Sequence, residues 1–241
     1  MRELSWDGCR NVRDLGGLPT ENGATTRFGS VVRADCVRQL SSTGWEALLA
    51  YGVRTIVDLR RDDERARDPQ GELPVDVVHA PLFGDGELFE VLGRAEEIDD
   101  PVARMCFVYG RFLDLRRPYF ATAVTAIARA GHGGVVVHCA GGKDRTGLMT
   151  ALLLRLAGVT LTEIAADYAI SERNLMPPRE LLEAEFGDRA EHELGWWTAG
   201  ERAMVEVVAE LERRHGGTRE FLRGGGVSDE DLERARARLV A

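Results

Sequence analysis

Cys139 and Arg145 are six positions apart in the segment His-Cys-Ala-Gly-Gly-Lys-Asp-Arg-Thr-Gly at 138–147. A cysteine followed at this distance by an arginine, on a glycine-rich turn, is suited to attack phosphate esters. The thiolate serves as nucleophile. The planar guanidinium can hold two phosphate oxygens and matches the charge of a transferring phosphoryl group. The segment therefore predicts a phosphate-binding loop in which Cys139 and Arg145 are catalytic.

Lys143, inside the same segment, is the only lysine of the chain, and every other one of the 31 Lys+Arg residues is an arginine. A composition that avoids lysine but keeps it at this position favours a functional role. Lys143 would raise the positive potential of the pocket toward multiply phosphorylated substrates. The alternative is an ordinary loop residue that faces solvent.

The flanking residues predict the elements that position this loop. A β-branched run bounded by glycines at 133–138 predicts a short buried strand, and 146–157 has the composition of a helix that ends at Gly158. In a strand-to-helix turn the backbone N–H groups form a concavity, and the helix N-terminus adds positive charge. This field favours a bound phosphate and a thiolate. Phosphate binding is therefore assigned to Ala140, Gly141, Gly142, Lys143 and Arg145.

Two neighbours of the loop are expected to support it. The Thr146 hydroxyl is expected to hydrogen-bond the sulfur when it departs as thiolate, and His138 is expected to orient the loop. Two other interpretations of Cys139 remain. It is either an inert buried cysteine in a glycine-rich turn, or part of a rhodanese-like sulfur carrier, whose loop is usually shorter.

The chain resembles the cysteine-dependent protein tyrosine phosphatases, and most closely a bacterial branch with the loop His-Cys-x-x-Gly-Lys-Asp-Arg-Thr-Gly. Residues 11–17, Asn-Val-Arg-Asp-Leu-Gly-Gly, resemble the N-terminal Asn-x-Arg-Asp-x-Gly-Gly signature of that branch. Residues 32–35 match its Arg-Ser-Asp stretch with Ala34 in place of serine, 54–60 match its Asp-Leu-Arg strand, and 226–232 are similar to its closing helix. The resemblance spans nearly the whole chain.

This resemblance implies hydrolysis of phosphotyrosine without metal or cofactor, and broader members act on phosphoserine, phosphothreonine and phosphoinositides. Larger tyrosine phosphatases carry their general acid on a separate Trp-Pro-Asp loop, and this chain contains no Trp-Pro-Asp. In the bacterial branch the proposed acid is the aspartate of the phosphate loop, which is Asp144 here.

Other polar residues have two interpretations each. Asp58 ends an expected strand, where a parallel sheet presents its active site. Its functional interpretation is a second acid or a residue that positions one, and its structural interpretation is a cap of the next helix. Arg13 and Asp14 either support the phosphate loop, as the resemblance implies, or pair with each other. Arg60 and Arg61 either widen the positive field or begin a solvated helix.

The composition and the motifs argue against several classes of protein. A net charge of −9 argues against general nucleic-acid binding. No stretch approaches the ~20 apolar residues of a membrane span, and the first residues lack the apolar region of a signal peptide. The four cysteines, Cys9, Cys36, Cys106 and Cys139, form no Cys-x-x-Cys pair, which argues against zinc and against a disulfide framework. No pair of histidines has the spacing of metal ligands. A reducing cytoplasm is expected.

The alternation of strands and helices predicts an α/β fold with a central, mostly parallel sheet flanked by helices, tyrosine-phosphatase-like, plus a C-terminal helical segment. Strands are expected at 30–33, 55–59, 75–82 and 133–138. Helices are expected after Ser41 up to Gly52, at 61–67, within 85–131 with breaks near Pro101 and Pro118, and at 161–170, 178–186, 198–214, 218–223 and 228–239. We expect one phosphatase domain over 1–241, with an α/β core at 1–158, the phosphate loop at 138–146 and a helical part at 159–241 packed on the core.

Trp196 and Trp197 are adjacent in a polar stretch between two expected helices. They form either a lid over the active site or a hydrophobic clamp that fixes the helical segment. The clamp is favoured, because aromatic clusters belong to cores more often than to lids.

The leading functional hypothesis is a phosphatase that uses a phosphocysteine intermediate on protein phosphotyrosine, and also on phosphoserine or phosphothreonine. The alternatives are a phosphatase for a small phosphorylated metabolite or a phosphoinositide, and a catalytically inactive phosphate-binding module. Inactive modules usually lack the cysteine, the arginine or the acid, and this chain has all three.

Overall fold

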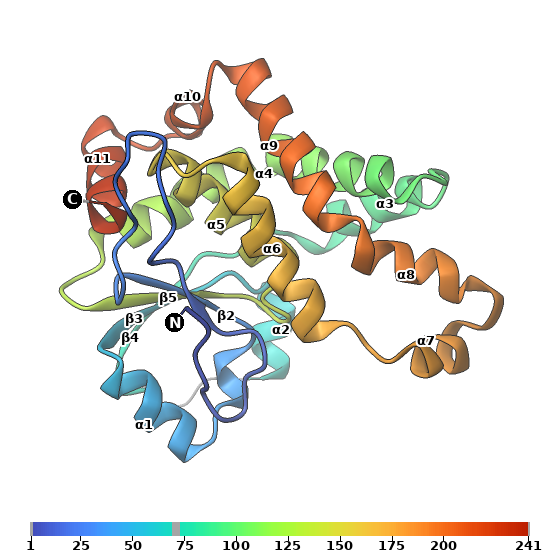
Figure 1. Ribbon diagram of the computed structural model, residues 1–241, viewed down its shortest axis with the longest axis horizontal. Coiled ribbons are helices and arrows are strands. Elements are labelled where there is room, and N and C mark those ends of the chain that lie inside the picture. Colours follow the sequence, from blue (N-terminus) through green and yellow to red (C-terminus); the bar gives the residue numbers. More distant parts are fainter. Residues whose placement is uncertain (1, 69–72, 241) are drawn as a thin grey trace.

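A computed structural model describes residues 2–68 and 73–240 of the chain (Figure 1). Within these ranges the centre is a five-stranded sheet of order β1-β2-β5-β3-β4. The strands are β1 (Arg13–Asp14), β2 (Val31–Ala34), β3 (Val53–Asp58), β4 (Asp76–His79) and β5 (Gly134–His138). All neighbouring strands are parallel except β1 and β2. The expected α/β fold with a mostly parallel sheet is confirmed, and β1 is an addition that the sequence analysis missed.

The middle strand, β5, is buried along its whole length. Its branched side chains alternate between two cores, with Val135 and Val137 in one and Val136 in the other. The register places His138, the last residue of β5, beside Ala34 of β2 and Asp58 of β3. The carboxyl ends of three parallel strands therefore meet at one edge of the sheet, where ligands bind in folds of this class.

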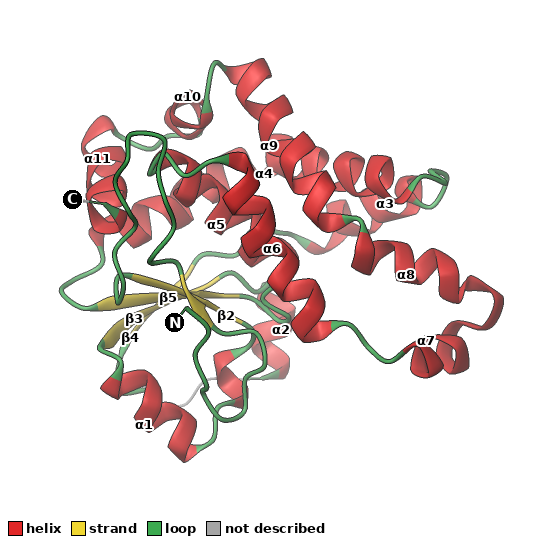
Figure 2. Cartoon of the chain, in the orientation of Figure 1, coloured by secondary structure: helices red, strands yellow, loops and turns green. Residues whose placement is uncertain are grey.

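Helices cover one face of the sheet, and α1 (Ser42–Ala50) with the N-terminal segment covers the other (Figure 2). The first face carries α4 (Pro101–Arg129), α5 (Asp144–Leu156), α6 (Leu161–Leu175), α9 (Gly200–His215), α10 (Thr218–Gly224) and α11 (Asp229–Leu239). One hydrophobic cluster runs from Leu15 through the sheet to Val240. The C-terminal helices thus share a core with the sheet.

The region between β4 and β5 holds α3 (Asp85–Ala95) and the long α4. Pro101 occupies the first turn of α4, where its missing N–H has no cost. The backbone leaves helical geometry at Arg116, two residues before Pro118, because the proline ring removes a hydrogen bond and collides with the preceding turn. The breaks expected at both prolines are present.

The C-terminal part contains a helix that the sequence analysis missed. After α7 (Arg179–Phe186) and the 3-10 turn η2 (Gly187–Arg189), α8 spans Ala190–Thr198 and carries both tryptophans. Gly195 lies inside α8, which weakens the helical pattern of the sequence. A Cβ atom at this position would lie 3.0 Å from Pro101, so the glycine lets α8 approach the start of α4. In Figure 1, α3, α7 and α8 lie at the end of the molecule opposite α11.

Candidate active site

The phosphate loop joins the end of β5 to the start of α5. Cys139 follows the last residue of β5, and α5 begins at Asp144. The loop curls back on itself, so that the amide of Gly142 donates to Sγ of Cys139 at 3.3 Å. Gly142 has φ +67°, and a Cβ there would lie 2.4 Å from the carbonyl oxygen of Ala34. Both the backbone conformation and the close approach require glycine at 142.

The carbonyl groups of the loop are bound from outside. The oxygen of Ala140 accepts from the amide of Cys36 at 2.9 Å. Nδ2 of Asn11 donates to the oxygens of Gly141 and Gly142, at 3.2 Å in each case. Because a trans peptide directs its N–H opposite to its C=O, these anchors turn the following amides toward the side that holds the Cys139 sulfur. Such a nest of amides is a binding site for an anion.

A buried charge cluster lies behind the loop, centred on Asp167 of α6. Asp167 pairs with Arg13 at 3.0 Å, with Arg33 at 2.7 Å and with Arg2. Arg33 also donates to the oxygen of Gly142 at 2.8 Å, and Arg13 donates to Oδ1 of Asn11 at 2.7 Å. These arginines therefore fix the loop both directly and through Asn11. Their excess positive charge favours an anion on the other side.

Asp14 does not pair with Arg13, which corrects the pairing interpretation. Its carboxylate accepts from the amides of Gly16 and Gly29, at 2.6 Å in each case, and from the hydroxyl of Tyr51. These contacts close the turn between β1 and β2. The structure therefore places Arg13 in the support of the phosphate loop and Asp14 in the neighbouring turn.

Removal of the Asp167 charge should destabilise the fold. Burial alone would raise the pKa of this carboxyl, but the surrounding arginines hold the pKa well below its usual range. Asp167→Asn leaves these arginines without their counter-charge, so we expect the free energy of unfolding at pH 7 to fall by about 3–5 kcal/mol. Urea denaturation measures this change.

The stabilisation by the Asp167 cluster depends on pH. A lowered pKa in the folded state stabilises the fold at neutral pH, and this contribution declines as pH falls from the unfolded carboxyl pKa, about 3.9, toward the folded one. The difference between wild type and Asp167→Asn should therefore shrink below about pH 4. The control is Asp99→Asn, which changes an exposed carboxylate. Equal stability of Asp167→Asn and wild type at pH 7 would contradict the role of this cluster.

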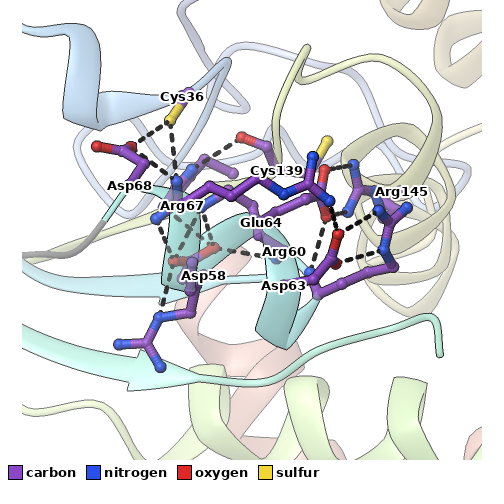
Figure 3. A network of polar contacts seen from close by, with 12 residues as sticks. Cys36, Asp58, Arg60, Asp63, Glu64, Arg67, Asp68, Cys139 and Arg145 are labelled. Atoms are coloured by element: carbon purple, nitrogen blue, oxygen red, sulfur yellow. Dashed lines mark hydrogen bonds and ion pairs between the residues drawn. The ribbon is translucent and has the colours of Figure 1, made fainter. Parts of the chain in front are cut away.

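Arg145, in the first turn of α5, is bound by Glu64 of α2 (Asp62–Arg67). Both guanidinium Nη atoms contact the carboxylate, Nη2 to Oε1 at 2.9 Å, and Figure 3 shows this pair close to Cys139. Burial alone would lower the pKa of Arg145, but Cys139 and Glu64 raise it above its ordinary value. Arg145 therefore stays charged beside Cys139. Glu64 itself was missed, because its acidic helix resembles an ordinary solvated one.

Asp58 points into the protein. It is fully buried, accepts from Nη2 of Arg60 at 2.9 Å and lies 3.6 Å from Nε2 of His138. Burial alone would raise the pKa of Asp58, but Arg60 and His138 lower it. The helix-cap interpretation is wrong, because the N-cap residue of α2 is Arg61. Asp58 instead holds Arg60, which is buried with it (Figure 3).

His138 and Thr146, which flank the loop, are both buried. His138 contacts the carbonyl oxygen of Cys139 through Nδ1 at 3.0 Å, and burial lowers its pKa. The hydroxyl of Thr146 is buried and has no hydrogen-bond partner within 2–68 and 73–240. In this structure the Cys139 sulfur accepts from the amide of Gly142, and the contact expected from Thr146 to the departing thiolate stays a prediction.

Lys143 is buried, at 6% exposure, so the solvent-facing interpretation is wrong. Its Nζ donates to the carbonyl oxygen of Trp196 at 2.6 Å and lies 4.4 Å from the ring centre of Trp197. Burial lowers the pKa of Lys143. The guanidinium of Arg104 stacks over the ring of Trp196, with Cζ 4.9 Å from the ring centre. The tryptophans thus fasten α8 to the phosphate loop and to α4, as a clamp does.

A cavity of about 590 Å³ opens above the loop. Lys143, Asp144 and Arg145 line it together with apolar side chains that come from α3, α4, α7, α8 and the loop after β4. The aromatic members of this wall are Phe83, Tyr109, Phe112, Phe186, Trp196 and Trp197. Both tryptophans therefore also bound this cavity.

No group of three or more His, Cys, Asp or Glu side chains in 2–68 and 73–240 could hold a metal ion. Among the helices that the structure describes, none has the length and apolar character needed to cross a bilayer.

Comparison with known proteins adds an independent observation. The family model described as "tyrosine phosphatase family" matches residues 4–241. A tyrosine-protein phosphatase of Nostoc commune is 32% identical over 223 residues, covering 86% of this chain and 73% of that protein. A putative tyrosine-protein phosphatase of Cupriavidus necator is 32% identical over 177 residues, 71% of this chain and 63% of that protein.

A third relative, a triple specificity protein phosphatase of Mycobacterium tuberculosis, is 26% identical over 279 aligned residues, which cover 100% of this chain and 99% of that protein. The resemblance read from the loop and the N-terminal segments is confirmed at the level of the family. The chain therefore belongs to the tyrosine phosphatase family, and it is a phosphoric monoester hydrolase of the protein-tyrosine-phosphatase type.

Proposed function

We propose that this phosphatase works through a phosphocysteine intermediate, with protein phosphotyrosine as its main substrate and phosphoserine and phosphothreonine as further substrates. The observation that carries the proposal is the loop itself. Its carbonyls are bound from outside by Cys36, Asn11 and Arg33, while the amide of Gly142 donates to the Cys139 sulfur. The Cys139 sulfur and an array of donors thus share one concave site, as attack on a phosphate dianion requires.

In the first step the Cys139 thiolate attacks phosphorus in line. An S–P bond forms while the bond from phosphorus to the leaving oxygen breaks, and Asp144 gives that oxygen its proton. Arg145 and the loop amides hold the other phosphate oxygens throughout. In the second step water attacks phosphorus and gives a proton to Asp144. The S–P bond breaks, and Cys139 leaves as thiolate together with inorganic phosphate.

The cavity supports an aromatic ester as the substrate. Lys143 and Arg145 line it, and most of the remaining lining is aromatic or aliphatic, with Glu96, Glu185 and Glu193 among it. An apolar wall beside two cations suits a phenyl ring carrying a phosphate. The relatives from Nostoc commune and Cupriavidus necator bear the name tyrosine-protein phosphatase, and the name of the Mycobacterium tuberculosis relative adds broader specificity. We further propose that 1–241 act as one domain, in a reducing cytoplasm that keeps Cys139 reduced.

A phosphatase for a small phosphorylated metabolite or a phosphoinositide is the second candidate. Arg61 lines the same cavity as Lys143 and Arg145, so more than one phosphate could be neutralised there. A panel of phosphotyrosine peptide, phosphoserine peptide, inositol phosphates and sugar phosphates separates the two. We expect the highest kcat/KM for the phosphotyrosine peptide. A preference of tenfold or more for an inositol or sugar phosphate would favour the second candidate.

Substitution of Asp144 tests its role as the acid. Asp144→Asn should lower kcat about 100-fold on a phosphoserine peptide, whose leaving alkoxide is basic. It should have little effect on p-nitrophenyl phosphate, whose leaving group hardly needs a proton. Asp58→Asn should lower both rates to a similar extent, because Asp58 is buried against Arg60. The reverse pattern would move the acid role to Asp58.

A further inference from the structure

Two buried tyrosines from different helices lie behind Asp144. Tyr109 of α4 and Tyr168 of α6 are 2% and 1% exposed, whereas the Asp144 side chain stands at the exposed start of α5. The hydroxyl of Tyr109 lies 2.5 Å from Oδ1 of Asp144. The hydroxyl of Tyr168 lies 2.6 Å from that of Tyr109 and 3.4 Å from the same carboxylate oxygen. Both phenols therefore converge on one oxygen of Asp144.

The direction of these hydrogen bonds follows from charge. Burial, and then the neighbouring Asp144, raise the pKa of both tyrosines well above the ordinary value, so each hydroxyl keeps its proton. With its proton retained, the Tyr109 hydroxyl donates to Oδ1 of Asp144. The oxygen of Tyr109 is then free to accept from Tyr168. The Tyr109 proton is thus directed toward Oδ1 and the Tyr168 proton toward the Tyr109 oxygen, so neither phenol binds Oδ2.

The packing leaves these rings little freedom. A Cβ atom at Gly147 would lie 2.7 Å from Cε2 of Tyr168, and one at Gly200 would lie 2.2 Å from Cε1. Two helices, α5 and α9, thus present glycines to the two edges of one ring. The rings of Tyr168 and Tyr109 meet edge to face at 6.4 Å. A hydroxyl pair held this firmly is a rigid support for an exposed carboxylate.

We propose that Tyr109, backed by Tyr168, is the positioning residue of Asp144. It binds Oδ1, so that Oδ2 carries the proton toward the leaving oxygen. This inference rests on the proposed role of Asp144 as the acid. The hydrogen bond persists when Oδ2 is protonated, because Oδ1 remains an acceptor in the neutral acid. Without it the exposed Asp144 side chain would spread over several rotamers, and fewer encounters would have the geometry for proton transfer.

Tyr109→Phe removes the hydroxyl and keeps the ring, which makes it the decisive variant. We expect kcat on a phosphoserine peptide to fall about tenfold with KM unchanged, since one hydrogen bond of roughly 1–1.5 kcal/mol is lost. The rate on p-nitrophenyl phosphate should stay near wild type, which also reports that the variant is folded. Tyr168→Phe should give the same pattern with a smaller loss. The control is Tyr119→Phe, also on α4, which is 43% exposed and should behave as wild type on both substrates.

A double variant separates positioning from general support of the fold. In the Asp144→Asn background, Tyr109→Phe should cause no further loss, because the group that it positions has lost its function. Independent losses that multiply, equal losses on both substrates, or an unchanged Tyr109→Phe would each overturn the role of the tyrosine. If Asp144→Asn shows the leaving-group difference and Tyr109→Phe does not, only the tyrosine is excluded. If Asp144→Asn lacks that difference, the acid assignment fails and the role of the tyrosine fails with it.

Discussion

Cys139→Ser should abolish turnover on every phosphate monoester that the wild-type protein hydrolyses. A serine hydroxyl is a far weaker nucleophile than a thiolate at neutral pH. The amide array and Arg145 remain, so the variant should still bind the substrate. Release of inorganic phosphate measures the first effect, and equilibrium binding of a phosphotyrosine peptide measures the second.

Cys106→Ser is the matched control for this variant. Cys106 is a half-buried thiol of α4 beside Ala203 and Glu206, and it does not line the cavity above the phosphate loop. It should keep full activity. Full activity of Cys139→Ser, or an activity that requires an added metal ion, would contradict the phosphocysteine mechanism.

Peroxide should inactivate the wild-type protein, because activity depends on the Cys139 thiol. Burial raises the pKa of Cys9, Cys36 and Cys106, so these thiols keep their protons and react slowly with peroxide. The Cys139 sulfur instead accepts from a loop amide, and a dithiol reductant should restore activity from its first oxidation stage. Inorganic phosphate in the loop should slow the inactivation, because it covers the Cys139 sulfur. An inactivation rate that is the same with and without saturating phosphate would show that another cysteine is the target.

The sequence predicted the loop well, because its signals are local. A valine strand, two glycines and a helix within about 25 residues define the turn that presents Cys139, and no distant residue is needed to recognise it. The same holds for the kink near Pro118 and for the break before Pro101. Each follows from a backbone rule that acts over one helical turn.

The supports of the loop could not be predicted in the same way. Asp167 lies 154 positions from Arg13, and Glu64 lies 81 positions from Arg145. Neither carboxylate belongs to a pattern that marks it out in the sequence, because a charged residue on a helix is usually a solvated one. Tyr109 resembles any apolar position of α4. These contacts appear only when the chain closes on itself.

Lys143 lies between residues that local sequence signals identify and residues whose contacts come from distant parts of the chain. Its isolation in the composition drew attention to the position, but it did not indicate what the side chain touches. In the structure Nζ binds the carbonyl of Trp196 and the ring of Trp197. Both partners belong to α8, the helix that the sequence analysis missed because Gly195 weakens its pattern. Because the sequence analysis missed α8, it could not predict the contacts of Lys143.

Arg145→Lys should be nearly as damaging as Arg145→Ala, and both should lower kcat by about 10³-fold or more. One ammonium group offers a point charge, whereas the transition state spreads its charge over oxygens that a planar fork can hold two at a time. Glu64 adds to the loss. Burial alone would raise the pKa of Glu64, but Arg145 lowers it. The Glu64 carboxylate would therefore form an ion pair with the new ammonium group and draw it away from the phosphate. Steady-state kinetics on phosphotyrosine peptide measures the change, and Arg202→Lys, an exposed arginine of α9 paired with Glu206, is the control. A change confined to KM would mean that Arg145 holds substrate and transition state equally, which would remove it from the catalytic step.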